Sequence, residues 1–268
     1  MEKTREQKIK DFKKANLERR QKIVEKYGFK TSEEYIKFLE KGVKVKKSTK
    51  KDVIVSKMKG VFYIVDLLDA TGSMGNNIGG KYDNSKSGII SSIKDMAVRK
   101  DVKYTFVEFI ERSRPLNYAI IDGNPSEINT DNIKFSGAIG GDTPLYWAVW
   151  SVISSLSDKV TKDDKVLIKV YTDGGNNSMI EYTSKAAELI EKVQKENFTV
   201  TFVATPRDLE MIKRQINVKD SNTLATANTA QGFQNSMATA RFATASYFSN
   251  SEAGMDTLVG FYKKEGKL

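Results

Sequence analysis

The sequence predicts an α/β fold in which helices flank a doubly wound, mostly parallel sheet, with a basic helical extension in front of it. Short, nearly continuous apolar runs, such as VFYIVDLL from Val61, are typical of strands buried on both faces of a parallel sheet. Segments with apolar residues every three or four positions separate these runs, and this alternation indicates parallel strands joined by helices. The charge also differs between the two parts of the chain. Residues 1–60 hold 20 Lys+Arg and 9 Asp+Glu, whereas residues 61–268 hold 24 Lys+Arg and 25 Asp+Glu.

The extension is predicted to span residues 1–58, and the main domain residues 59–268. Apolar side chains at helical spacing indicate an amphipathic helix that Gly28 ends; a second helix and a basic linker, 43–52, follow it. Because isolated short helices are marginal in water, we expect these helices to dock on a protein surface, either their own domain or a partner. The basic face leaves nucleic acid and a membrane surface open as less favoured partners.

Strands and helices are predicted in alternation along the main domain. The expected strands are 61–68, 103–110, 117–121, 165–171, 198–204 and, in a tail rich in Ser, Thr, Ala and Asn, 222–228. The expected helices are 85–99, 143–156, 179–196, 207–216 and a last one from about residue 231. Asp66 interrupts the first strand, where a lone buried carboxylate would be costly, so we expect it to have a Lys or Arg partner or to lie at an exposed end.

Composition excludes several kinds of chemistry. The chain has no histidine and no cysteine, which excludes serine-hydrolase triads, cysteine–histidine pairs, disulfides and zinc sites of the usual ligands. A metal site must therefore use oxygen ligands, which favour hard cations such as Mg²⁺, Mn²⁺ or Ca²⁺. No run reaches the roughly 20 apolar residues of a membrane span. The charged N-terminus lacks the apolar core of a secretory signal, so we expect a cytoplasmic protein.

Three segments are predicted to bring oxygen ligands to one edge of the sheet. Asp69, Thr71 and Ser73 follow the first strand, Thr143 begins a later helix, and Asp173 follows strand 165–171. In open α/β sheets, ligands bind outside the carboxyl ends of the strands, where the strand order reverses. Two carboxylates and three hydroxyls on glycine-rich loops suit a cation that takes six oxygens at about 2.1 Å. The sequence therefore predicts a site for a divalent metal ion.

These residues resemble the metal-ion-dependent adhesion site of the von Willebrand factor A (vWA) family. That motif is Asp-x-Ser-x-Ser after the first strand, then a distant Thr and a distant Asp followed by Gly. Asp69, Thr71, Ser73, Thr143 and Asp173 match it in type and order, with Thr71 departing from the more familiar serine. The resemblance covers roughly residues 59–268. It implies a Rossmann-like sheet and one metal ion, Mg²⁺ before Mn²⁺ or Ca²⁺.

The same resemblance implies a function. An Asp or Glu of a partner protein completes the shell of the metal, so the chain acts as a metal-dependent binding or assembly module. Stand-alone family members occur in bacteria and large bacteriophages, so we expect a chain of that type, in the cytoplasm or associated with a virion.

Each part of the motif has a plain alternative when it is taken alone. Thr143 followed by Pro144 is a good helix N-cap. Asp173 with the glycine after it is a good turn, and Asp69 with the hydroxyls after it could bond nearby backbone. Asp142 is interpreted as a loop residue or as an outer partner of the site. Only the joint occurrence of the five residues favours a metal.

Two other functions stay open at this point. One is a structural component of a virion or multiprotein shell, with the metal stabilising the loops. The other is a phosphatase of the haloacid-dehalogenase type, which places Asp-x-Asp-x-Thr after its first strand. Here the nucleophile position two residues before Asp69 is Leu67, so the nucleophilic carboxylate is missing. We therefore expect no enzymatic activity.

Overall fold

The computed structural model describes residues 60–75, 80–137, 140–252 and 261–262, all within one structural unit, Ser56–Leu268. The predicted extension, with its two helices and its linker, lies outside the described residues. So does the predicted domain boundary at residues 58 and 59. Within the described ranges, no helix is both long and apolar enough to cross a membrane.

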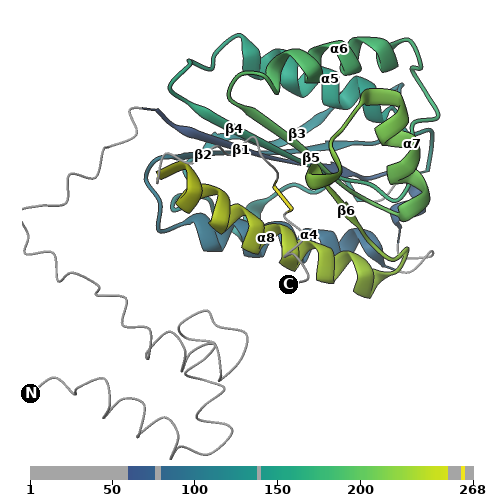
Figure 1. Cartoon of the computed structure of the whole chain (residues 1–268). Helices are drawn as coiled ribbons and strands as arrows, with labels where there is room; N and C mark the ends of the chain where they lie inside the picture. Colours follow the sequence, from purple (N-terminus) through teal and green to yellow (C-terminus); the bar gives the residue numbers. More distant parts are fainter. Residues whose placement is uncertain (1–59, 76–79, 138–139, 253–260, 263–268) are drawn as a thin grey trace, which may run out of the picture. The chain divides into compact units, whose positions relative to one another are not determined.

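One six-stranded sheet forms the centre of the domain, in the order β3-β2-β1-β4-β5-β6 (Figure 1). Every neighbouring pair is parallel except β2 and β3, which are antiparallel. The strands are β1 (Phe62–Asp69), β2 (Val102–Phe109), β3 (Asn117–Gly123), β4 (Lys165–Tyr171), β5 (Phe198–Ala204) and β6 (Thr223–Ala225). The sheet confirms the predicted doubly wound, mostly parallel architecture.

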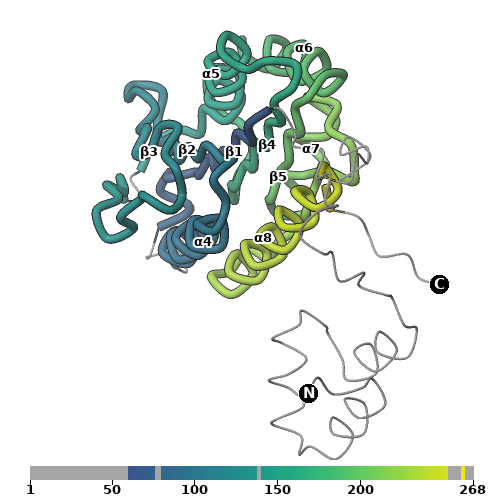
Figure 2. The backbone as a smooth tube through the Cα atoms, turned by 90° about the vertical axis from the view of Figure 1, so that its left-hand side faces the viewer, coloured from purple at the N-terminus to yellow at the C-terminus, as the bar shows by residue number. Residues whose placement is uncertain are grey.

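Helices cover both faces of the sheet, as Figures 1 and 2 show. One layer holds α5 (Leu145–Ser157), α6 (Tyr182–Val193) and α7 (Pro206–Ile216), and the other holds α4 (Lys81–Met96) and α8 (Ala230–Glu252). Side chains of β1 alternate between the two layers, with Val65 and Leu67 in the core under α5 and Ile64 and Leu68 in the core under α4. The central strands are therefore buried on both faces, which is why their sequences are almost continuously apolar.

Element boundaries differ from the prediction chiefly at α4. The helix begins at Lys81, four residues before the predicted start at residue 85. Its first turn is polar in sequence, so apolar periodicity does not reveal it, yet Lys81 and Tyr82 are both buried. The helix start therefore faces inward, although its composition is typical of a loop.

Asp66 has the basic partner that the sequence requires. It stands directly opposite Lys169 of β4, and the carboxylate Oδ1 lies 2.9 Å from the lysine Nζ with both side chains fully buried. The hydroxyl of Tyr104 donates to the other oxygen, Oδ2, at 2.7 Å. The buried charge is thus paired and hydrogen-bonded inside the sheet, and the group is a structural one.

Candidate metal centre

The candidate site lies between the carboxyl ends of β1 and β4. These neighbouring parallel strands continue into the segments that begin at Asp69 and at Thr172, respectively. From β1 the chain winds outward to β2 and β3, and from β4 it winds the other way to β5 and β6. The strand order therefore reverses between β1 and β4, at the place where open α/β sheets form their binding crevice.

The loop after β1 is folded around the carboxylate of Asp69. The backbone N–H of Thr71 donates to Asp69 Oδ1 at 2.8 Å, and a 3₁₀ turn, Gly72–Met74, follows at once. Met74 is fully buried in the core under α4, which holds the turn against the domain. This fold brings the Thr71 Oγ1 and Ser73 Oγ atoms within 3.3 Å of each other.

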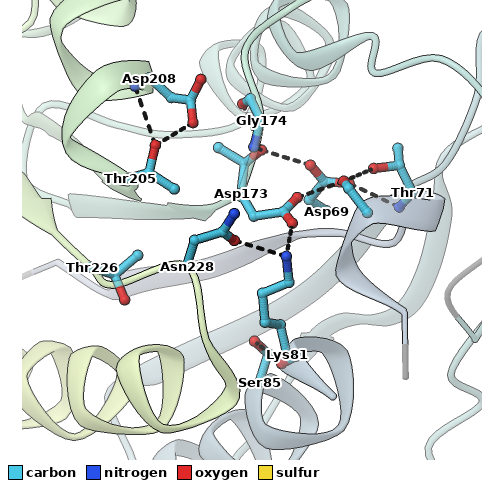
Figure 3. A network of polar contacts seen from close by, with 12 residues as sticks. Asp69, Thr71, Lys81, Ser85, Asp173, Gly174, Thr205, Asp208, Thr226 and Asn228 are labelled. Atoms are coloured by element: carbon cyan, nitrogen blue, oxygen red, sulfur yellow. Dashed lines mark hydrogen bonds and ion pairs between the residues drawn. The ribbon is translucent and has the colours of Figure 1, made fainter. Parts of the chain in front are cut away.

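The loop after β4 is joined to the first loop by two side-chain hydrogen bonds. Ser73 Oγ donates to Asp173 Oδ1 at 2.6 Å, and Thr172 Oγ1 donates to Asp69 Oδ2 at 2.6 Å. The Thr172 hydroxyl also accepts from the Gly174 N–H at 3.1 Å, which fixes the turn that carries Asp173. Figure 3 shows Asp69, Thr71 and Asp173 converging on one place. The structure thus brings four of the predicted residues together.

The fifth predicted residue, Thr143, has no hydrogen bond to the other four among the described contacts, and its backbone is bonded to Asn177 instead. Its N–H donates to the Asn177 side chain at 2.6 Å, and the Asn177 N–H donates back to the Thr143 carbonyl at 3.2 Å. Asn177 stands four residues after Asp173, so the Thr143 loop is tied to the Asp173 loop. The preceding Gly141 has a φ of 134°, in a region that favours glycine.

Thr143 is not the N-cap of the helix that follows it, the alternative role that the sequence left open. Helix α5 has Pro144 as its N-cap, and no side-chain hydrogen bond caps it. Asp142, just before Thr143, accepts the Arg112 N–H at 3.1 Å. Asp142 therefore anchors its loop, in line with the interpretation of it as a loop residue.

The oxygen positions fit a small hard cation. Adjacent ligands of an octahedral Mg²⁺ ion lie about 3 Å apart. The Thr71–Ser73 and Ser73–Asp173 oxygen separations, 3.3 and 2.6 Å, are close to that spacing. Within the described ranges no three His, Cys, Asp or Glu side chains gather into a cluster. Only two carboxylates are available, and hydroxyls would have to complete the protein's share of the shell.

Burial disfavours the charged form of the Asp69 carboxylate in this site. Burial raises the pKa of Asp69 to about 6; the hydrogen bonds from Thr172 and Thr71 oppose the rise, and the negative charge of Asp173 adds to it. A desolvated carboxylate near a second one is stabilised by added positive charge. A divalent cation between Asp69 and Asp173 would supply that charge.

Sequence reasoning missed one ionisable member of the site. The side chain of Lys81 is 1% exposed, and its Nζ makes an ion pair with Asp173 Oδ2. The same Nζ donates to the Asn228 side chain at 2.8 Å (Figure 3). The available signal was a lysine directly after a glycine pair, between β1 and the next helix, but the sequence analysis did not identify Lys81 as a member of the site.

Comparison with known proteins supports the fold. No protein-family model matches the sequence, and no curated protein matches it significantly. Among solved structures, one match is proximal thread matrix protein 1 from the mussel byssus, in a form with a zinc-occupied metal-ion-dependent adhesion site. It superposes with a TM-score of 0.51 at 15% sequence identity, and the match covers 68% of this chain and 45% of that one. The pilus adhesin SpaC from Lactobacillus rhamnosus GG gives 0.55 at 12% identity over 68% and 30%.

A third structure matches along almost its whole length. It is the von Willebrand factor domain of the pilus tip protein Mfa5 from Porphyromonas gingivalis, with a TM-score of 0.50 at 8% identity, covering 68% of this chain and 96% of that one. The two longer proteins extend well beyond the region that this chain matches. At these identities the likeness concerns the fold alone. The described part of this chain has the fold of a von Willebrand factor A domain.

Proposed function

We propose that this chain is a protein-binding module that grips its partner through one divalent metal ion. The ion would be held by the two carboxylates and three hydroxyls of Asp69, Thr71, Ser73, Thr143 and Asp173. The observation that carries the proposal is the bridge from Ser73 to Asp173, which sets oxygens of two distant loops at the spacing of neighbouring metal ligands. The bridge lies where the strand order reverses, the expected position for a ligand.

The chemistry of the donors supports Mg²⁺ as the first choice, with Mn²⁺ and Ca²⁺ as alternatives. All five side chains offer oxygen, which hard cations prefer. When bound, the metal would supply a positive centre for an outside carboxylate. The two proposed carboxylate ligands balance a divalent ion and the other three ligands are neutral hydroxyls, so an Asp or Glu of the partner could still join the shell as a further ligand. Specificity for that partner would come from the loops around the site.

Two of the structural neighbours carry names that agree with binding. SpaC is called a pilus adhesin, and the mussel matrix protein was described with zinc in an adhesion site. These names describe those proteins, and they support a binding role for this chain only together with its own donor set. A bacterial or phage source, a cytoplasmic location and a place in a virion or another shell stay predictions.

The donor set does not support the phosphatase alternative. Leu67 occupies the position where such an enzyme places its nucleophilic carboxylate, and its side chain is fully buried in the core under α5. The hydroxyls of Thr71 and Ser73 have no histidine base to activate them, because the chain contains none. We therefore propose a module that binds without turnover.

The test is metal binding by the purified chain. Mn²⁺ binding should be measured from the loss of the free-ion electron paramagnetic resonance signal, and thermal unfolding should be followed with and without Mg²⁺. A ligand that binds only the folded state raises its Tm. Asp69→Ala and Asp173→Ala should each abolish most of the binding and of the Tm shift. Asp83→Ala, on the outer side of α4, is the matched control and should change neither.

A partner test follows from the same variants. Proteins captured from source cells by the wild-type chain should be released by EDTA and should be absent with Asp69→Ala. Metal binding that persists in both site variants would refute the proposed site. Partner capture that is indifferent to EDTA and to Asp69→Ala would refute the metal-dependent grip.

A further inference from the structure

Lys81 is an unusual residue to bury beside a cation site. It is the first residue of α4, and its ammonium group contacts the Asp173 carboxylate and the Asn228 amide oxygen. The N-terminus of a helix carries partial positive charge, which opposes a cation at this position. Burial also removes the lysine from water. The ion pair with Asp173 is therefore the principal interaction that offsets both costs.

The start of α4 is held so that Lys81 keeps this position. Gly80, the N-cap, has a φ of 65°, which turns the chain sharply into the helix. Tyr82 is anchored on the far side, because its hydroxyl donates to Glu108 and accepts from the Gly137 N–H at 2.9 Å. Glu108 is itself fully buried and accepts the Ser136 N–H at 2.8 Å. The neighbours of Lys81 in the chain, Gly80 and Tyr82, thus hold it in position.

Asp173 divides its two oxygens between different partners. Oδ1 accepts from Ser73, one of the proposed metal ligands, and Oδ2 faces Lys81. Only Oδ1 is directed toward the other proposed ligands. Counted as ions, Asp69, Asp173 and Lys81 give the site a charge of −1, and a divalent metal brings it to +1. Without Lys81 the same site would pass from −2 to neutral.

We propose that Lys81 is a specificity-determining residue of this site, a built-in cation that shares Asp173 with the metal, weakens metal binding and leaves the loaded site positive for an acidic partner. This inference rests on the proposed function and deepens it. Lys81 also balances the charge of Asp173 when no metal is bound.

The chain supplies a matched control for this idea. Lys169 is also fully buried and also pairs with an aspartate, Asp66, but it lies inside the sheet and outside the site. Lys169→Met removes a buried ammonium of the same kind. It should lower stability without changing the affinity for metal.

The experiment compares Mn²⁺ dissociation constants, from the free-ion resonance signal, for wild type, Lys81→Gln, Lys81→Met and Lys169→Met. The glutamine variant keeps a hydrogen-bond donor for Asp173, so it should fold even if the methionine variant does not. A unit charge removed within a few ångströms of the ion should tighten Mn²⁺ binding at least about tenfold. The Tm of the metal-free Lys81→Gln protein should fall, and its rise on adding Mg²⁺ should exceed that of wild type.

The outcomes separate the two proposals. Unchanged or weaker Mn²⁺ binding in Lys81→Gln, with wild type binding normally, overturns the role of Lys81 and leaves the metal site standing. Tightening in Lys169→Met as well as in Lys81→Gln would also overturn it, because the effect would then not belong to the site. Absence of Mn²⁺ binding in wild type and in both Lys81 variants overturns both proposals. Binding that emerges only in Lys81→Gln, with none in wild type, would support the effect of Lys81 on metal affinity but overturn the proposed metal-dependent grip of the wild-type chain.

Discussion

Ser73 and Asp173 stand 100 residues apart in the chain, yet the serine hydroxyl donates a 2.6 Å hydrogen bond to the aspartate Oδ1. One loop follows β1 and the other follows β4, so the bond joins the two loops where the strand order reverses. It also keeps two proposed ligands facing each other.

Ser73→Ala removes one oxygen of the proposed shell and breaks this bond. We expect metal affinity to fall at least about tenfold, the effect typical of losing a group that holds or orients a metal ligand. The change removes the hydroxyl of an exposed residue, so the metal-free Tm should stay close to that of wild type. Ser73→Thr keeps the oxygen and is the control. Equal metal affinity in Ser73→Ala and wild type would contradict the role of Ser73.

Thr172 donates a hydrogen bond to the Asp69 carboxylate, although it is not one of the ligands predicted from the sequence. Its hydroxyl bonds Asp69 Oδ2 at 2.6 Å and is fully buried. Thr172→Val leaves that buried carboxylate oxygen without this donor, which should lower the free energy of unfolding by about 1–3 kcal/mol. Urea unfolding measures the change, and Thr172→Ser should recover most of it. A Thr172→Val protein as stable as wild type would show that the bond contributes nothing.

The regular elements could be predicted because their signals are local. Strands β4 and β5 agree with prediction at both ends, 165–171 and 198–204, since each is a run of buried side chains between polar turns. The start of α4 could not be placed, because its first turn owes its burial to Asp173 and Glu108, which are distant in sequence. Local periodicity carries no information about such contacts.

The site residues likewise differ in whether the sequence reveals them. The five proposed ligands stand in a motif whose spacing can be recognised. By contrast, Lys81 meets partners 92 and 147 residues away. The need of Asp66 for a basic partner followed from the cost of burying a charge. Its identity, Lys169, required the register of β1 against β4.

The Asp66–Lys169 pair should behave as a coupled unit. Lys169→Met strands a buried carboxylate, and breaking such a pair typically costs about 3–5 kcal/mol. Asp66→Asn combined with Lys169→Met removes both charges, so its loss of stability should be clearly smaller than the sum of the two single changes. Denaturant unfolding of the four proteins completes the cycle. Additive losses would show that the two charges do not interact.

Thr143 offers the sharpest choice between a structural and a functional role. As a helix cap its hydroxyl would stabilise α5, and removing it would cost about 1 kcal/mol whether or not metal is present. The structure instead makes Pro144 the N-cap, with no side-chain capping bond. Thr143→Val keeps the size and the β-branch but removes the hydroxyl. We therefore expect it to leave the metal-free free energy of unfolding nearly unchanged and to reduce the rise in Tm on adding Mg²⁺.

Thr143→Ser keeps the hydroxyl and should behave as wild type in both measurements. The comparison with and without metal separates the two roles. If the Thr143 hydroxyl is a metal ligand, its removal reduces the Tm only in the presence of metal. Suppose Thr143→Val lost stability equally with and without Mg²⁺ and kept the full metal-induced shift. The hydroxyl would then act on the helix and not on the ion, and the proposed shell would shrink to the four residues that hydrogen bonds already join.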